Sequence, residues 1–240
     1  MYAKIHEARV STQVATLGQV DSNVFPLPAL DRLPSGRHRL SVEAVRESQR
    51  GRLLWAIVQA VADKGYAATT VADIVERANV SRTTFYQQFQ DKESCFLASF
   101  DFGVEFVLVQ MRAAWEGLAA HGDWHQHTRS DLTTYLQTLA AEPAFAIALH
   151  VEVFGAGAAA VDRRSQILAL FTERTRRIHE QARRANPEIP ELPLEVFKLH
   201  TGGLDELIRE HLRTRGADSL PELTEPLLAA TFSLFSGQYP

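Results

Sequence analysis

The residues that follow Ser81 combine an apolar spacing with a face of hydrogen-bonding side chains. Phe85 and Phe89 stand four residues apart, so on a helix both would point inward. The positions left facing outward are Arg82, Thr83, Thr84, Tyr86 and Gln87. An arginine can donate two hydrogen bonds to guanine, a glutamine can pair with adenine, and a threonine methyl can contact thymine. The pattern therefore predicts a short helix that reads base edges in the major groove of DNA.

The residues just before Ser81 predict the elements that would hold this reading helix in place. Thr70 and Asp73 have the spacing of a capping box, and Asn79 stands in a turn that requires a residue tolerant of positive φ. Apolar residues at helical spacing predict a first short helix: Val71, Ile74, Val75 and Ala78. A helix-turn-helix at about residues 72–91 follows, with Thr70 expected to bond a phosphate at the helix N-terminus.

Basic residues gather before this motif. A supporting helix is predicted to end at Gly65, and residues 1–45, which contain FPLPAL and DRLPSG, are expected to form a flexible arm. Arginines that could reach DNA from the arm and the helix are Arg37, Arg46 and Arg50, with Arg39 and Arg52 nearby. One interpretation is that the arm places arginines in a narrow minor groove, and the alternative is a disordered tail that adds only nonspecific attraction.

Charge is distributed unevenly along the chain, whose net charge is −4. Residues 31–92 carry 10 Lys and Arg against 7 Asp and Glu, whereas residues 93–240 carry 13 against 20. A basic module on an acidic body concentrates the attraction for phosphate on one part of the molecule. The distribution agrees with a DNA-binding module near the N-terminal side.

Composition excludes several other protein classes. The single cysteine, Cys95, cannot form an intramolecular disulfide, and the first residues lack the continuous apolar run of a secretory signal. The apolar stretch 144–161 is interrupted by His150 and Glu152, which favours a buried helix over a membrane span. We expect a cytoplasmic protein. Catalytic motifs and phosphate loops are missing from the sequence, so we expect no enzyme activity, no cofactor and no metal.

The remainder of the chain predicts helices throughout. The expected ranges are 125–141, 143–157, 162–185, 194–215 and 221–236, after a helix that begins near Asp91. The fold class is therefore all-α with about nine helices: an N-terminal three-helix helix-turn-helix domain and a helical C-terminal domain.

Residues 49–109 resemble the N-terminal DNA-binding domain of the TetR family of transcriptional regulators. The most specific positions are Gly65-Tyr66, Thr69-Thr70-Val71, Ile74, Ala78, Val80-Ser81, Thr84-Phe85-Tyr86, Phe89 and Asp91-Lys92-Glu93. The resemblance implies a homodimer whose reading helices enter successive major grooves of a palindromic operator. It also implies phosphate contacts from Tyr86 and Lys92. Asn79, where the family commonly has glycine, and Gln87-Gln88, where many members carry a basic residue or histidine, depart from the pattern.

The resemblance further implies a C-terminal domain that dimerises and often binds a small effector. We expect an arm at 1–45, a DNA-binding domain at 46–92 and an effector-binding and dimerisation domain at 93–240. Candidates for the ligand pocket are Phe106, Met111, Trp115, Trp124, Phe145, Leu149, His150 and Phe154, with ordinary core packing as the favoured alternative for each. Candidates for the dimer interface are Leu199, Gly203, Leu207, Leu228, Phe232 and Phe235, with burial inside one protomer as the alternative.

The function that follows from these features is a dimeric, sequence-specific regulator, a repressor released from its operator by a small molecule. Two alternatives stay open. The protein could be a constitutive or architectural DNA binder without a ligand, or it could be a transcriptional activator.

Overall fold

The computed structural model describes residues 41–116 and 123–236, and in these ranges it contains nine α-helices, two 3₁₀ helices and no strand. The all-α prediction is confirmed. The chain divides into two units, residues 1–48 and 49–240. In the first unit the described residues 41–48 contribute the beginning of helix α2 (Val42–Lys64), so the last residues of the segment expected to be a flexible arm are helical.

Three predicted caps set the bounds of the helix-turn-helix. Helix α3 (Val71–Ala78) begins at a complete capping box, in which the Thr70 side chain accepts from the backbone of Asp73 and the Asp73 side chain accepts from Thr70. It ends at Asn79, whose φ of 50° and ψ of 53° lie in the left-handed region that asparagine tolerates. Helix α4 (Arg82–Gln88) begins where Ser81 Oγ accepts from the Thr84 backbone at 3.0 Å.

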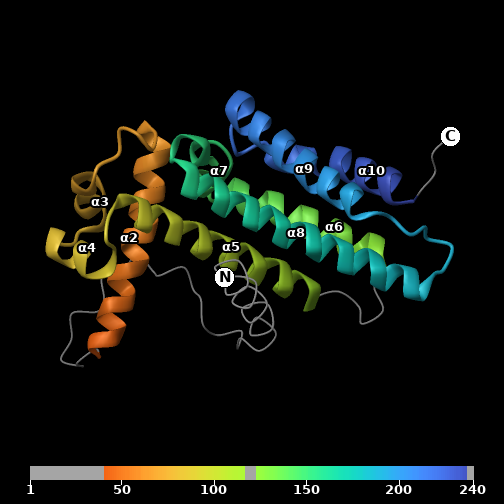
Figure 1. Cartoon of the computed structure of the whole chain (residues 1–240), viewed down its shortest axis with the longest axis horizontal. Helices are drawn as coiled ribbons and strands as arrows, with labels where there is room; N and C mark the ends of the chain where they lie inside the picture. The colour runs from red at the N-terminus through yellow and green to blue at the C-terminus, as the bar shows by residue number, and fades with distance from the viewer. Residues whose placement is uncertain (1–40, 117–122, 237–240) are drawn as a thin grey trace. The chain divides into compact units, whose positions relative to one another are not determined.

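Figure 1 shows α3 and α4 as two short helices beside α2. The remaining α-helices are α5 (Lys92–Glu116), α6 (Trp124–Ala141), α7 (Pro143–His150), α8 (Ala158–Ala185), α9 (Leu194–Arg215) and α10 (Thr224–Phe235). Helices α6 and α8 lie between α5 on one side and α9 and α10 on the other (Figure 1). By length and composition alone α5 could cross a membrane, but core helices of soluble proteins have the same character, and here it packs against α6 and α8.

The predicted helix 143–157 is wrong beyond His150. Helix α7 ends there, and residues Glu152–Gly155 form a 3₁₀ turn. Glycines lower the helix propensity of this stretch, and Gly157 adopts a φ of 100° before α8. As a result α8 begins at Ala158, four residues earlier than expected. Another 3₁₀ turn, Leu220–Leu223, replaces the beginning of the predicted helix 221–236.

Two apolar clusters stabilise the second unit. The first joins the helix-turn-helix to α5 and α7 through fully buried side chains that include Ile57, Ile74, Phe85 and Phe96. The second joins α6 to α9 and α10 and includes Leu136, Ile208 and Leu228. Burying such side chains removes apolar surface from water, which is the main term that favours folding. The helix-turn-helix is thus held on the body through a shared core.

Candidate nucleic-acid interface and ligand cavity

Helix α4 presents polar side chains outward and one aromatic side chain inward. Phe85 is fully buried, whereas Arg82, Thr83 and Gln87 are exposed and Tyr86 is 54% exposed with its ring edge against Phe85. Within the described residues Arg82 has no hydrogen bond or ion pair to another side chain or backbone group. Its guanidinium is therefore available to an external acceptor.

Two hydroxyls predicted to touch DNA have hydrogen-bond partners at the beginnings of α3 and α4. The Thr84 hydroxyl lies 2.9 Å from Ser81 Oγ, and the Thr70 hydroxyl donates to Asp73 Oδ2 at 2.6 Å. Asp73 also lies 2.6 Å from Lys64 Nζ. The hydrogen bonds from Lys64 and Thr70 hold the pKa of Asp73 far below its usual value, so the carboxylate is ionised. A phosphate approaching Thr70 would meet this paired anion and cation together.

Lys92 has a structural role that the sequence did not predict. Its Nζ donates to the carbonyl oxygens of Tyr66 at 2.7 Å and Thr69 at 2.8 Å, and it lies 4.0 Å from the centre of the Tyr66 ring. Desolvation lowers the pKa of this ammonium. Two of its three N–H donors thus bind the loop between α2 and α3.

Two arginines of α2 also bind inside the domain. Arg52 Nη1 donates to the carbonyl of Ala78 at 3.0 Å and to that of Asn79 at 3.3 Å, so it caps the end of α3. The Arg50 guanidinium lies 4.6 Å from the centre of the Phe89 ring, at the end of α4. Arg46 is exposed on α2. Arg37 and Arg39 lie outside the described residues.

One side chain of the body hydrogen-bonds the helix-turn-helix directly. Glu152, in the 3₁₀ turn after α7, accepts from the backbone N–H of Tyr66 at 2.9 Å. A Cβ added at Gly65, whose φ is +82°, would lie 3.3 Å from the same carboxylate oxygen. The turn before α3 is therefore held from two sides, by Lys92 and by Glu152.

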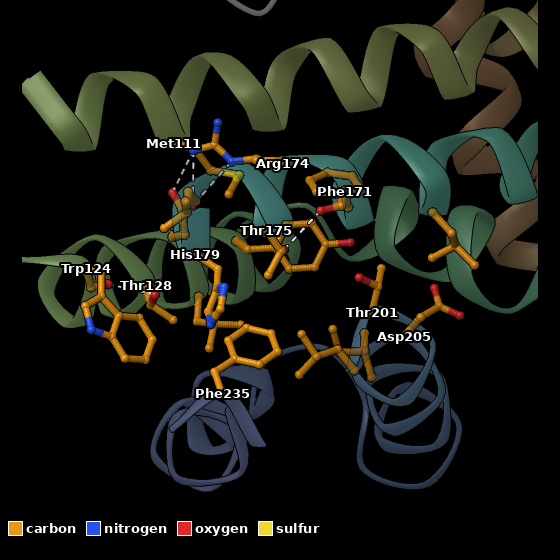
Figure 2. Close-up of a pocket in the computed structure, with 17 residues that line it drawn as sticks. Met111, Trp124, Thr128, Phe171, Arg174, Thr175, His179, Thr201, Asp205 and Phe235 are labelled. Carbon is orange, nitrogen blue, oxygen red and sulfur yellow. Dashed lines mark hydrogen bonds and ion pairs between the residues drawn. The ribbon is translucent and has the colours of Figure 1, made fainter. Parts of the chain in front are cut away.

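A cavity of about 100 Å³ lies in the body between α5, α6, α8, α9 and α10. Its wall is mostly apolar, and Figure 2 shows Met111 and Trp124, two of the predicted pocket residues, at its edge. A smaller cavity of about 40 Å³ adjoins it and is lined by two more, Leu149 and His150. The two cavities share Tyr135, Leu168, Phe171 and Asp205 in their walls.

Four predicted pocket residues do not line either cavity. Phe145 is buried in the core, where its ring lies 5.5 Å from that of Trp55. Phe154 is 48% exposed beneath the Arg164 guanidinium. Trp115 lies behind the wall and donates to Asp131, and Phe106 is absent from both linings. These positions were chosen for aromatic character at helical spacing, a property that core residues share.

Two ion pairs lie in the cavity walls, and no local sequence pattern indicates either of them. Arg174 Nη2 lies 3.0 Å from Asp131 Oδ1, and burial raises the pKa of Asp131. Asp205 Oδ1 lies 3.0 Å from His150 Nδ1, and its other oxygen pairs with Arg164. Burial opposes ionisation of Asp205, but the hydrogen bond of His150 and the charge of Arg164 leave its pKa below the usual value.

The predicted dimer residues fall into two groups. Leu199 and Leu207 on α9 are 68% and 46% exposed, and a Cβ added at Gly203 would meet no atom within 4 Å. Leu228 and Phe235 on α10, by contrast, are almost fully buried, which favours the alternative of burial inside one protomer. Phe232 is half-buried, with its ring 5.3 Å from that of Trp124. Their apolar face covers the core of the protomer, which the sequence pattern cannot distinguish from a face that covers a partner.

Sequence comparison supports the prediction of a helix-turn-helix DNA-binding domain. The family described as "Bacterial regulatory proteins, tetR family" matches residues 53–99. The HTH-type transcriptional activator FasR of Mycolicibacterium smegmatis is 32% identical over 84 residues, 35% of this chain and 38% of the relative. YvkB of Bacillus subtilis, an uncharacterized HTH-type transcriptional regulator, is 45% identical over 42 residues, 18% of this chain and 22% of the relative. The matched segments thus span well under half of these relatives' own length.

Solved structures share the fold over most of the chain. The fatty acid degradation regulator FadR of Bacillus halodurans superposes with a TM-score of 0.68 at 19% identity, covering 79% of this chain and 96% of that chain. FadR of Bacillus subtilis in complex with stearoyl-CoA gives a TM-score of 0.65 at 19% identity, covering 78% and 98%. Identity this low shows the fold alone. Residues 53–99 therefore match the DNA-binding segment of the tetR family of bacterial regulatory proteins, and the chain shares its fold with solved structures of transcriptional regulators.

Proposed function

We propose that this protein is a dimeric repressor that binds a palindromic operator and leaves it when a small molecule enters the body. The observation that carries the proposal is that one compact unit holds both the exposed polar face of α4 and an apolar cavity. Arg82, Thr83, Thr84 and Gln87 would contact base edges, and Tyr86 would contact phosphate. Thr70, Lys92, Arg46 and Arg50 are proposed as further contacts of the DNA backbone, and Arg37 as a contact in the minor groove. Such a regulator would act in the cytoplasm.

The exposed side of α9 supports dimerisation. Leu199, Gly203 and Leu207 follow one another at intervals of four residues, which places them on one face, and each is exposed. Two glycines in sequence, Gly202 and Gly203, leave room for a second helix to approach closely. A two-fold axis against this face would bring the same residues of both copies together.

Replacing Leu207 with glutamate is expected to halve the mass of the particle in solution, because a charge would be buried at the centre of the interface. Light scattering coupled to size exclusion measures this. Gln137→Glu, which adds the same charge at an exposed position of α6, should leave the mass unchanged. A monomeric wild-type protein, or a dimer that survives Leu207→Glu, contradicts the proposed interface.

The cavity supports an effector with an apolar chain. At about 100 Å³ it is smaller than the roughly 300–1,000 Å³ of typical ligand sites, so an effector has to separate the surrounding helices. His150 on α7 lies in the wall of the adjoining cavity, two residues before the Glu152 that holds the Tyr66 backbone. A ligand that displaces His150 would therefore also displace Glu152, which is two residues away and binds the turn before α3.

Stearoyl-CoA, the compound bound to the Bacillus subtilis FadR, is the first effector to test. We expect it to release the protein from a DNA site selected out of a random pool, as measured by fluorescence anisotropy of the labelled DNA. CoA without an acyl chain should have no effect, and Ile178→Trp, which fills the cavity, should abolish release while keeping DNA affinity. The proposal of an acyl-CoA effector fails when the acyl compound and CoA alone behave identically.

Activation is the second candidate, because one curated relative, FasR, is named a transcriptional activator. Run-off transcription from a template that carries the selected site separates the two. A repressor lowers the amount of transcript in the absence of effector, and an activator raises it.

A further inference from the structure

Most polar side chains that line the larger cavity already have partners inside the protein. Asp131 binds Arg174 and Trp115, and Asp205 binds His150. The hydroxyls of Thr175 and Thr128 donate to the carbonyls of Phe171 and Trp124, at 3.0 and 2.8 Å. The Tyr135 hydroxyl lies 3.2 Å from His150 Nε2. These groups need nothing from a ligand.

Two side-chain atoms of the wall are exceptions. His179 Nε2 on α8 and Thr201 Oγ1 on α9 are buried and have no hydrogen-bond partner among the described residues. His179 is 2% exposed and Thr201 is 7% exposed, so neither is satisfied by bulk water. Figure 2 shows His179 beside Phe235 and Thr201 near Asp205, at two different places along the wall. Buried polar atoms without partners are rare, because each loses its hydration without compensation.

A hydroxyl group fits the unpartnered His179 atom. Burial lowers the pKa of the imidazole, which favours the neutral ring. A neutral imidazole has one N–H donor and one lone-pair acceptor. A ligand hydroxyl can donate to a bare Nε2 or accept from a protonated Nε2, so it satisfies this atom in either tautomer.

The ion pairs in the cavity wall indicate that the ligand group bound by His179 and Thr201 is neutral. Asp131 is paired with Arg174, and Asp205 is paired with His150 and Arg164. No unpaired charge therefore remains among the described residues of the wall to compensate a charged ligand group. An ion brought into this apolar space would lose its hydration without a counter-ion.

We propose that the effector carries an uncharged hydroxyl on its apolar chain, which forms a hydrogen bond with His179 Nε2, and that Thr201 Oγ1 binds a second polar atom of the same ligand. This rests on the proposed use of the cavity as the effector site, and it adds the chemical class: a hydroxylated chain, with any anionic group held outside the cavity. A plain hydrocarbon chain would leave both atoms unpaired.

The first test requires no ligand. Thr201→Val exchanges an unpartnered hydroxyl for a methyl of equal size, so the unliganded variant should melt at a higher temperature than the wild type. Thr175→Val is the matched control in the same wall, and it should melt at a lower temperature, because it removes a hydroxyl that has a partner. Equal decreases in both variants show that Thr201 is already satisfied, by a bound water or otherwise, and overturn the proposal.

The second test measures ligand preference by calorimetry on the full-length protein. Wild type should bind one hydroxystearoyl-CoA isomer at least about tenfold more tightly than stearoyl-CoA, because a site with an unpartnered polar atom discriminates against a ligand that has no hydrogen-bonding group to place there. His179→Leu should abolish this preference while binding of stearoyl-CoA persists. No preference among the isomers, or a preference unchanged in His179→Leu, overturns the inference even when stearoyl-CoA releases DNA. A preference that persists without any DNA release overturns the proposed function alone.

Discussion

Arg82→Ala is expected to weaken binding to the selected DNA site by about 1–3 kcal/mol per half-site and to relax the preference for one base pair. The reason is the position of Arg82 at the start of α4, exposed and without an internal partner in the described chain. A free guanidinium can take the bidentate geometry that distinguishes guanine, whereas a guanidinium bound inside the protein cannot. Competition binding against sites that vary one base pair at a time measures both effects.

Arg77→Ala provides the matched control. Arg77 is also exposed on the helix-turn-helix, but it lies on α3 and is paired with Asp63 at 2.5 Å. Its loss should change affinity for the selected site little and leave base preference intact. Equal losses on the selected site and on random DNA for Arg82→Ala would remove this residue from base recognition and leave it only a backbone contact.

The helix-turn-helix could be predicted from local chemistry because its bounds depend on residues close together in sequence. Thr70 with Asp73, Asn79, and Ser81 each act within four residues of the groups they satisfy. The 3₁₀ turn at Glu152 could not be predicted in this way, since its hydrogen bond is to Tyr66, far away in the chain. The turn forms where a tertiary contact and glycines outweigh helix propensity.

Cations were the least predictable part of the DNA-binding domain. Arg50, Arg52 and Lys92 were all interpreted as part of a basic surface, yet each binds an aromatic ring or carbonyl oxygens inside the domain. Only the fold determines whether a lysine or arginine faces a phosphate or a helix end. The cavity was predictable only in part: large apolar side chains at helical spacing indicated Met111 and Trp124, but nothing local in the sequence indicates His179, Thr201 or the ion pairs.

The hydrogen bonds of Glu152 and Lys92 connect the ligand cavity to the helix-turn-helix in the proposed mechanism. The loop between α2 and α3 has its N–H at Tyr66 bound by Glu152 of the body, and its carbonyls bound by Lys92 at the start of α5. Helix α5 also contributes Met111 to the cavity wall. A ligand that moves α5 or α7 would therefore act on the loop that places α3, and α3 in turn packs against the reading helix.

Lys92→Met tests this structural role of Lys92 against its proposed contact with phosphate. Methionine keeps an unbranched side chain but removes all three donors, so the carbonyls of Tyr66 and Thr69 lose their partner. Hydrogen bonds to a charged group contribute about 1.5–3 kcal/mol each when buried, and these are partly exposed, so we expect a loss of about 2 kcal/mol in unfolding free energy. Thermal and chemical denaturation measure it. Lys198→Met, an exposed lysine of α9, should leave stability unchanged.

The salt dependence of DNA binding then decides which role dominates. A lysine that only holds the loop leaves the number of neutralised phosphates unchanged, so Lys92→Met should weaken binding to all sequences while the slope of log K against log salt stays constant. A lysine that contacts phosphate directly lowers the magnitude of that slope by about 1 per protomer and costs little stability. Because Lys92 still has one donor free beyond its two carbonyls, a fall in both stability and slope would mean that the same ammonium holds the loop and touches the DNA. An unchanged melting temperature would rule out the structural role, because two charge-assisted hydrogen bonds cannot be lost from this loop without a measurable effect.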